Sequence, residues 1–300
     1  MTAALTDLPV EAPVCAAPDP FPHSPRQPLP RLSCDSHMHI CGPESRYEYA
    51  AARIYTPPDA LLEDYLNLAK TLGIERVVFV QPSVYGNDNT AMLETMKQCP
   101  LQNRGVAVLD HTVSEDILDE LNRAGIRGVR FNLVDIAEAT RQIPLEPIRQ
   151  LAQRIEPYDW HVELLVHVDD HPNLDTLLGD MPVDIVVGHL GYFRPDRNTN
   201  DQGFQALLRL MQAGRCWAKL TGPYRVSAGE VPYSSVEKFA RLLVREAPER
   251  VLWGSDWPHV MVKNAMPNDG DLVDLLFDWV PDASVRHGIL VNNAAKLYDF

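Results

Sequence analysis

From residue 31 onward, short runs of apolar residues alternate with longer segments in which apolar residues recur at helical spacing. The short runs are rich in β-branched residues and show little polar alternation, which is typical of parallel strands buried on both faces. Eight of these runs are predicted as strands, four of them ending near residues 39, 81, 109 and 131 and four spanning 162–166, 184–188, 216–220 and 251–254.

The segments between the predicted strands carry helix start and stop signals, such as Pro57 at the start of one segment and Gly125 at the end of another. The predicted helices span residues 57–70, 115–124, 201–213, 235–246, 269–279 and 283–297. Because strand and helix alternate, we predict an α/β fold, a (β/α)8 TIM barrel over residues 31–300. A doubly wound open sheet is the alternative, but no Gly-x-Gly-x-x-Gly motif follows the first strand.

Residues 1–30 hold eight of the 25 prolines and show almost no periodicity, so we predict a flexible or loosely docked extension there. The net charge of −14 disfavours nucleic acid or an anionic membrane surface as a partner. The five cysteines form no C-x-x-C pair, and no apolar stretch approaches 18 residues. Together with an N-terminus unlike a signal peptide, these features predict a cytoplasmic protein that does not span a membrane.

Side chains suited to metal binding follow several predicted strands. Asp35, His37 and His39 occupy alternate positions at the end of the first strand, so we predict that they share one face. Two imidazoles on one face can bind a single cation. In a barrel, the carboxyl ends of all strands meet at the working face. Three further residues fall at or just beyond such ends, on strands five, six and eight: His167, His189 and Asp256.

The chain resembles the amidohydrolase superfamily over residues 31–300, in the branch of metal-dependent hydrolases and non-oxidative decarboxylases. Its motifs are most similar to the 2-pyrone-4,6-dicarboxylate lactonase group, in residues 35–43, 55–57, 81–89, 128–132 and 253–259. The resemblance implies that Asp256 is a general base on the attacking water and then a proton donor to the departing oxygen. It also implies that His37, His39 and His189 bind a metal or polarise the lactone carbonyl.

The same resemblance implies that Arg130 and Arg225 clamp a substrate carboxylate. Ser83 and Tyr55 could add neutral hydrogen bonds to that ligand.

The chain also departs from the lactonase group, with Ile136 and Tyr192 where arginines are expected and Leu165 where a tyrosine is expected. His167 falls where metal-dependent relatives carry a ligand on strand five. We therefore expect one divalent ion, most simply Zn²⁺, bound by His37, His39 and Asp256, with His167 or His189 completing the set.

The resemblance implies a hydrolase for a small anionic lactone, like the zinc-containing sister enzymes that open 4-sulfomuconolactone to maleylacetate and sulfite. Three alternatives remain. They are a 2-pyrone-4,6-dicarboxylate lactonase, a metal-dependent non-oxidative decarboxylase, and a binding or sugar-lactone isomerising protein on the same barrel. The sequence leaves the oligomeric state open.

Overall fold

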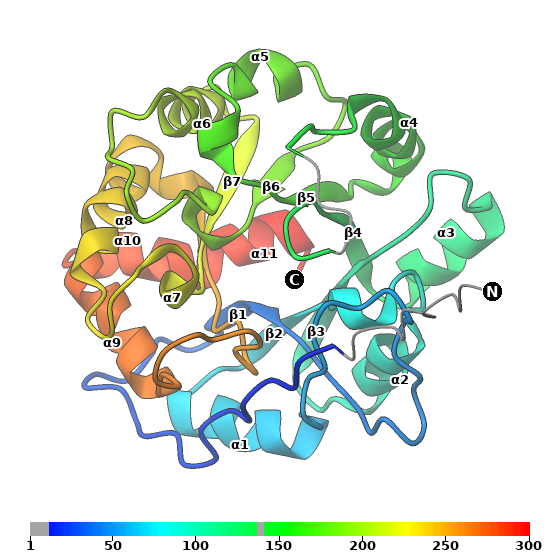
Figure 1. The fold of residues 1–300 in the computed structure, drawn as a ribbon, viewed down its shortest axis with the longest axis horizontal. Coiled ribbons are helices and arrows are strands. Elements are labelled where there is room, and N and C mark those ends of the chain that lie inside the picture. The colour runs from blue at the N-terminus through cyan, green and yellow to red at the C-terminus, as the bar shows by residue number, and fades with distance from the viewer. Residues whose placement is uncertain (1–11, 137–140) are drawn as a thin grey trace, which may run out of the picture.

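Eight parallel strands form a barrel in chain order, β1 to β8, in a computed structural model that describes residues 12–136 and 141–300 (Figure 1). The strands are β1 Cys34–Met38, β2 Arg76–Val80, β3 Gln102–Ala107, β4 Ile126–Asn132, β5 His161–Leu165, β6 Ile185–Val187, β7 Cys216–Leu220 and β8 Val251–Trp253. Each strand ends within two residues of its predicted end. The predicted TIM barrel is confirmed.

Helices surround the barrel on the outside (Figure 1). They are α1 Leu62–Leu72, α2 Thr90–Gln98, α3 Glu115–Arg123, α4 Leu145–Ile155, α5 Leu174–Leu178, α6 Gln202–Gln212, α7 Pro223–Val226, α8 Ser234–Glu246, α9 Asp269–Trp279, α10 Ala283–His287 and α11 Asn293–Tyr298. The first helix begins later than predicted because Ala60 pairs with Cys41 through two backbone hydrogen bonds of 2.7 and 3.1 Å, which keeps this segment extended.

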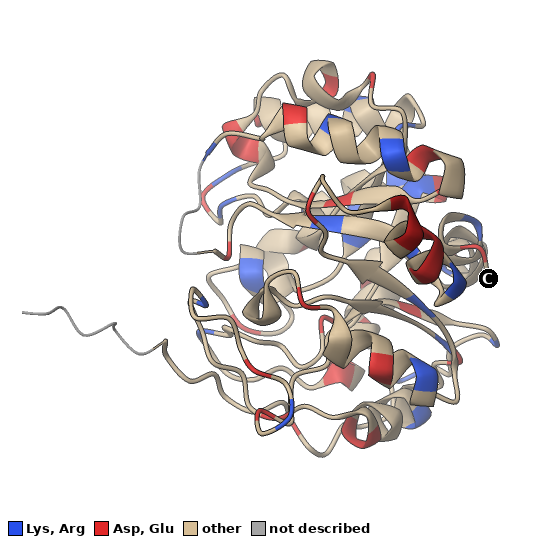
Figure 2. Cartoon of the chain, turned by 90° about the vertical axis from the view of Figure 1, so that its right-hand side faces the viewer, with Lys and Arg blue, Asp and Glu red and all other residues tan. Residues whose placement is uncertain are grey.

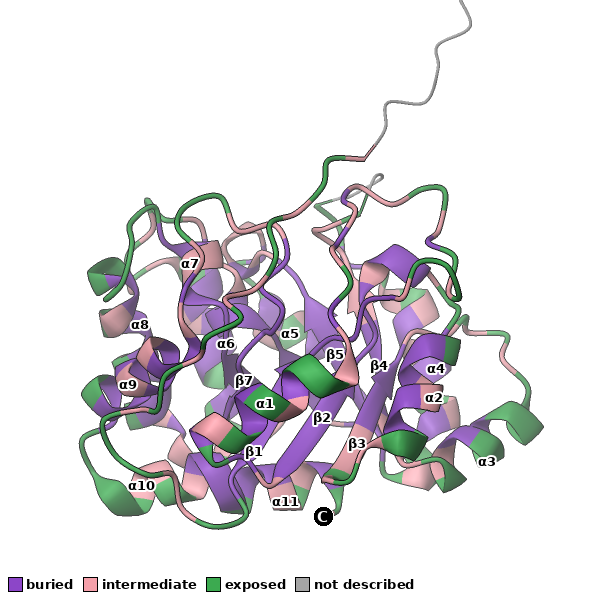
Figure 3. Cartoon of the chain, turned by 90° about the horizontal axis from the view of Figure 1, so that it is seen from below, coloured by how far each residue is buried: buried purple, intermediate pink, exposed green. Residues whose placement is uncertain are grey.

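Two layers of apolar side chains build the core. The larger layer lies between the sheet and the helices, and it includes Val77, Phe79 and Leu164. The smaller layer fills the barrel, where Val78 and Trp217 pack with Tyr298 of α11. Figure 3 accordingly shows buried strands, and helices that are buried on one side and exposed on the other.

The barrel closes between β1 and the segment after β8. The His39 amide donates to the Trp257 carbonyl, and the Asp256 amide donates to the His37 carbonyl, both at 2.8 Å. A Cβ at Gly254 would lie 2.7 Å from the His37 backbone nitrogen, so only glycine allows this approach. The closure brings the end of β8 against the histidines of β1.

The prediction that Asp35 shares a face with the two histidines is wrong. The register of β1 against β2 shifts between Asp35 and Met38, so the strict alternation of side chains breaks there. As a result, the Asp35 carboxylate accepts from Tyr65 of α1 at 3.0 Å and from the Ser255 hydroxyl at 2.6 Å. Asp35 therefore links β1 to α1 and to the segment after β8, while the His37 side chain faces the interior of the barrel.

The described part of the N-terminal segment contacts the barrel at several points. The Cys15 amide donates to the Thr56 carbonyl at 2.8 Å, and the Arg26 amide donates to Asp274 of α9 at 2.9 Å. Residues 1–11 of the predicted extension lie outside the described residues.

Acidic and basic positions are interspersed over the outer helices on the side shown in Figure 2. No helix in the described part of the chain is long and apolar enough to cross a membrane. The five cysteines, all within that part, are free thiols.

Candidate active site

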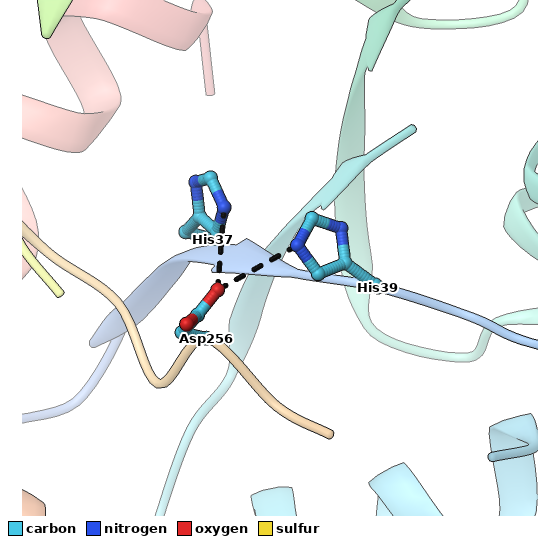
Figure 4. Close-up of side chains that lie close together, drawn as sticks. All are labelled: His37, His39 and Asp256. Carbon is cyan, nitrogen blue, oxygen red and sulfur yellow. Dashed lines mark ion pairs between the residues drawn. The ribbon is translucent and has the colours of Figure 1, made fainter. Parts of the chain in front are cut away.

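Four side chains from three strand ends converge on one carboxylate oxygen. Oδ1 of Asp256 lies 3.6 Å from Nε2 of His37, 3.6 Å from Nε2 of His39 and 3.9 Å from Nε2 of His189. Figure 4 shows the first two imidazoles turned toward Asp256. All four residues are buried. The structure thus brings together four of the residues that the sequence singled out.

The outer nitrogens of two imidazoles are held by the barrel. Nδ1 of His39 lies 2.7 Å from the Val80 carbonyl, which can only accept, so this nitrogen carries the hydrogen. Nδ1 of His189 lies 2.6 Å from the Thr221 hydroxyl. Partners of this kind fix the ring orientation and leave the Nε2 lone pair free for a ligand at the centre.

The third imidazole is held by a buried ion pair. Nδ1 of His37 lies 3.3 Å from one oxygen of Glu163, on β5, and 3.1 Å from Nζ of Lys219, on β7. The lysine also lies 2.5 Å from the other oxygen of Glu163 and donates to the Ser36 carbonyl at 2.8 Å. Burial raises the pKa of Glu163, but Lys219, His37 and Arg130 together outweigh burial and hold that pKa well below its usual range.

The backbone at the centre is held in a sparsely populated conformation. His189 and Asp256 have φ angles of 46° and 63°, in the left-handed region. Gly222, with φ 54°, fits closely against both residues, because a Cβ there would lie 2.8 Å from Nδ1 of His189 and 3.0 Å from Oδ2 of Asp256. The site therefore requires a glycine two residues after the end of β7.

The central group fits a metal ion. Nε2 of His37 and Oδ1 of Asp256 have no hydrogen-bond partner among residues 12–136 and 141–300. The ligand atoms of His37, His39 and Asp256 all lie within 4.8 Å of one another. Donors about 2.0–2.2 Å from a tetrahedral zinc ion are separated by ~3.4 Å, close to the distances seen here. Burial lowers the pKa of His189 to about 4, so its ring is neutral at pH 7, as a metal ligand must be.

The second oxygen of Asp256 is fully engaged. Oδ2 accepts from Nε of Arg225 at 2.8 Å and from the Tyr224 hydroxyl at 2.6 Å. The other two nitrogens of Arg225 donate to Asp135 at 3.3 Å and to the Val260 carbonyl at 2.9 Å. Burial raises the pKa of Asp256, but Arg225 and the three histidines together outweigh burial and hold that pKa well below its usual range. Arg225, expected on the substrate, thus has protein acceptors for all three nitrogens.

The other three predicted substrate-binding residues come from three different segments: Arg130 from β4, Ser83 from the turn after β2 and Tyr55 from the loop between β1 and α1. Arg130, on β4, donates to the Gln81 carbonyl at 3.0 Å, and its Nε has no hydrogen-bond partner among the described residues. The Ser83 hydroxyl donates to the Tyr55 hydroxyl at 3.5 Å. Oε1 of Glu163 lies 4.0 Å from the Nε of Arg130, within reach of an ion pair but too far for a hydrogen bond, so Arg130 retains a buried donor without a hydrogen bond in the described part of the chain.

His167 lies apart from the central group. Its Nδ1 lies 2.6 Å from the Tyr192 carbonyl, and its ring stacks on that of Tyr192 at 4.9 Å. The ring of Tyr192 also lies 5.6 Å from that of His189. Among the described residues, the group of possible metal ligands consists of His37, His39 and Asp256, so it includes neither His167 nor His189.

A family model described as Amidohydrolase matches residues 34–300. The chain belongs to this family. A 2-pyrone-4,6-dicarboxylate hydrolase from Comamonas testosteroni is 36% identical over 92% of this chain and 93% of its own length. A 4-sulfomuconolactone hydrolase from Rhizobium radiobacter is 35% identical over 90% and 91%. The structure of a probable 2-pyrone-4,6-dicarboxylic acid hydrolase from Acinetobacter baumannii, with citric acid bound, has a TM-score of 0.78 at 27% identity, covering 90% of this chain and 100% of its own.

A cavity of about 490 Å³, a size that suits a small molecule, lies beside Tyr224 and Arg225, the two residues that hold Oδ2 of Asp256 in this amidohydrolase. The four central residues themselves do not line it. Its lining includes Asp135, His167, Tyr192, Tyr224, Arg225 and Lys263. Of the positions that depart from the lactonase pattern, Tyr192 lines the cavity, Leu165 is buried, and Ile136 is 36% exposed.

Sequence reasoning missed several residues that hold the site together. Glu163 and Lys219 are charged residues inside otherwise apolar strands. Because side chains alternate along a strand, their positions could have indicated that they point into the barrel. Gly222 and Tyr224 belong to a Gly-Pro-Tyr-Arg turn after β7, next to the predicted Arg225.

Proposed function

We propose that this amidohydrolase opens a small anionic lactone of aromatic catabolism, with 4-sulfomuconolactone as substrate and maleylacetate and sulfite as products. The chain is a hydrolase, as its family and its curated relatives show. One observation carries the proposal: Oδ1 of Asp256 is unpartnered among the described residues and faces three imidazole Nε2 atoms. The free thiols fit a reducing cytoplasm, which we propose as its location.

We assign a divalent ion, zinc, to His37, His39, His189 and Asp256. When bound, such an ion lowers the pKa of a water toward neutrality and polarises a carbonyl oxygen. Of the two histidines that the sequence left open, we assign His189, because its Nε2 lies 3.9 Å from Oδ1 of Asp256, whereas Nδ1 of His167 lies 2.6 Å from the Tyr192 carbonyl.

Asp256 moves the proton. Its Oδ1 takes a proton from water as the water oxygen bonds to the lactone carbonyl carbon. The ring C–O bond then breaks, and Asp256 returns the proton to the departing oxygen. In 4-sulfomuconolactone this leaves a hydroxyl and a sulfonate on one carbon. That hydroxyl loses its proton to become the ketone of maleylacetate, while the C–S bond breaks and its electron pair leaves with sulfite. Throughout, Tyr224 and Arg225 keep the carboxylate oriented through Oδ2, at 2.6 and 2.8 Å. The low pKa of Asp256 keeps it ionised and ready to accept at neutral pH.

Two cations are proposed to bind the substrate's anionic groups. Arg130 has a buried Nε without a hydrogen-bond partner in the described part of the chain, 4.0 Å from the Glu163 carboxylate, and a substrate carboxylate would supply that hydrogen bond. Lys263 lines the mouth of the cavity, where it can meet a second anionic substituent. Arg225 is assigned to Asp256 instead, and Ser83 and Tyr55 remain proposed neutral contacts. The relative with bound citric acid supports an anionic ligand.

The principal rival substrate is 2-pyrone-4,6-dicarboxylate, on which the 36% identical relative is named to act. A non-oxidative decarboxylase is the other rival, and carbon dioxide release without lactone opening would identify it. The chain lacks two arginines expected for the dicarboxylate, with Ile136 and Tyr192 at these positions. Each lost charge-assisted contact is worth about 1.5–3 kcal/mol.

The test is kcat/KM for 4-sulfomuconolactone and 2-pyrone-4,6-dicarboxylate on the same zinc-loaded preparation. We expect the sulfonated lactone to be preferred by roughly a hundred-fold or more, if the two losses add. A preference for the pyrone would make the dicarboxylate lactonase the answer.

A further inference from the structure

The hydrogen bonds that hold Oδ2 of Asp256 continue away from the substrate cavity. The Tyr224 hydroxyl, 2.6 Å from Oδ2, also lies 3.0 Å from Nδ1 of His259. The other ring nitrogen of His259 lies 3.1 Å from each carboxylate oxygen of Asp269, at the first position of α9. His259 and Asp269 are buried, and neither lines the 490 Å³ cavity.

The hydrogen atoms in the row of contacts from Asp256 through Tyr224 and His259 to Asp269 can be counted. There are three contacts, the last of which runs from one ring nitrogen of His259 to both oxygens of Asp269, and each contact needs one hydrogen. Both ends are carboxylates, so the hydrogens come from the middle, one from the Tyr224 hydroxyl and two from the His259 ring. With both ring nitrogens protonated, every contact is satisfied, and the Asp269 carboxylate balances the charge.

The direction of the Tyr224 hydrogen follows from this arrangement. Because His259 donates to the tyrosine oxygen, the hydroxyl hydrogen must point at Asp256. Without that donor, the hydroxyl could turn to Nδ1 of His259, and Oδ2 would keep only its bond from Arg225. The terminal torsion of an aspartate is soft, so the carboxylate could then rotate and move Oδ1 away from the imidazoles.

We propose that Asp269 and His259 are positioning residues that act through Tyr224 to aim Oδ1 of Asp256 at the three imidazoles. The proposal rests on the proposed function, since it gives Oδ1 the role of metal ligand and base. His259 reaches Asp256 only through Tyr224 and through its own backbone amide, which donates to the Asp256 carbonyl at 2.8 Å.

The test compares Asp269→Asn with Asp271→Asn. Asp271 lies in the same first turn of α9, but its carboxylate contacts His23, 3.2 Å away at the surface. Both changes remove one charge from the same helix end. We expect Asp269→Asn to raise the zinc dissociation constant and to lower kcat, each by about ten-fold, with KM within two-fold. We expect Asp271→Asn to leave all three values within two-fold.

Tyr224→Phe, which removes only the hydroxyl, provides the second variant. We expect it to weaken zinc binding as much as Asp269→Asn does. We expect the double variant Tyr224→Phe/Asp269→Asn to bind zinc no more weakly than Tyr224→Phe alone. Additive effects of Tyr224→Phe and Asp269→Asn on zinc binding would overturn the proposed positioning role, as would equal effects of Asp269→Asn and Asp271→Asn.

The zinc readout separates this proposal from the proposed function. Wild-type protein that binds zinc but opens no lactone would contradict the lactonase activity, and the zinc comparison would still decide the positioning role. Protein that neither binds zinc nor opens a lactone would overturn both.

Discussion

One oxygen of Glu163 lies 2.5 Å from Nζ of Lys219, and the other lies 3.3 Å from Nδ1 of His37. The pair therefore has two separable roles. The two charges neutralise each other inside the barrel, and we propose that Glu163 also accepts a hydrogen bond from Nδ1 of His37, which leaves Nε2 free for a metal.

The double variant Glu163→Gln/Lys219→Met separates these roles. Glu163→Gln alone leaves Lys219 buried without its counter-ion, so we expect the free energy of unfolding to fall by about 3–5 kcal/mol. Zinc affinity should fall by about 10- to 100-fold. The double variant should recover most of the stability but not the zinc affinity. Urea unfolding and chelator competition measure the two, with Glu237→Gln on the surface as the control. Recovery of zinc affinity in the double variant would mean that Glu163 has no role in orienting His37.

A second prediction concerns the fourth metal ligand. We expect His189→Ala to lose bound zinc and His167→Ala to retain it, because Nε2 of His189 lies 3.9 Å from Oδ1 of Asp256 while His167 stacks on Tyr192. Elemental analysis of protein purified without chelator gives the zinc content per chain. Loss of zinc in His167→Ala with retention in His189→Ala would reverse the assignment.

Much of the fold and part of the site were predictable from the sequence. The eight apolar runs located every strand, because strands buried on both faces leave a strong signal. His37, His39, His189 and Asp256 were found because each lies at or beyond a strand end, and a barrel brings those ends together.

Other features were not predictable because they depend on tertiary contacts. The shifted register in β1, which turns Asp35 away from His37, leaves no mark in the apolar pattern. His167 had the expected parity, but β5 ends at Leu165, and the chain beyond it no longer alternates. The sequence also could not reveal that Arg225 donates to Asp256, since 31 residues separate them.

A third prediction concerns substrate binding. We expect Arg130→Met to lower kcat/KM by roughly ten- to a hundred-fold, since it removes a charge-assisted contact worth about 1.5–3 kcal/mol. Arg127→Met is the matched control on the same strand, where the side chain pairs with Asp299 at 3.2 Å. Steady-state kinetics and thermal unfolding should be measured together. A large fall in Tm with unchanged kinetics would show that Arg130 is structural.

A fourth prediction concerns stability in acid. Burial lowers the pKa of His161, at the start of β5, to about 4, whereas an unfolded histidine titrates near 6.5. The folded protein therefore binds this proton more weakly than the unfolded chain does. The contribution of neutral His161 to the free energy of unfolding is fully present above pH 6.5. It is lost as the pH falls toward 4, by about 1.4 kcal/mol per pH unit. We expect urea unfolding of His161→Gln to show a shallower loss than wild type over this range. Equal slopes would contradict a neutral His161.

The most direct test of the account is a zinc titration of metal-free protein, with bound zinc and kcat/KM for 4-sulfomuconolactone measured on the same samples. The account predicts that activity rises in proportion to bound zinc and saturates at one ion per chain, and that His37→Ala shows neither binding nor activity. Full activity in protein without metal would contradict it.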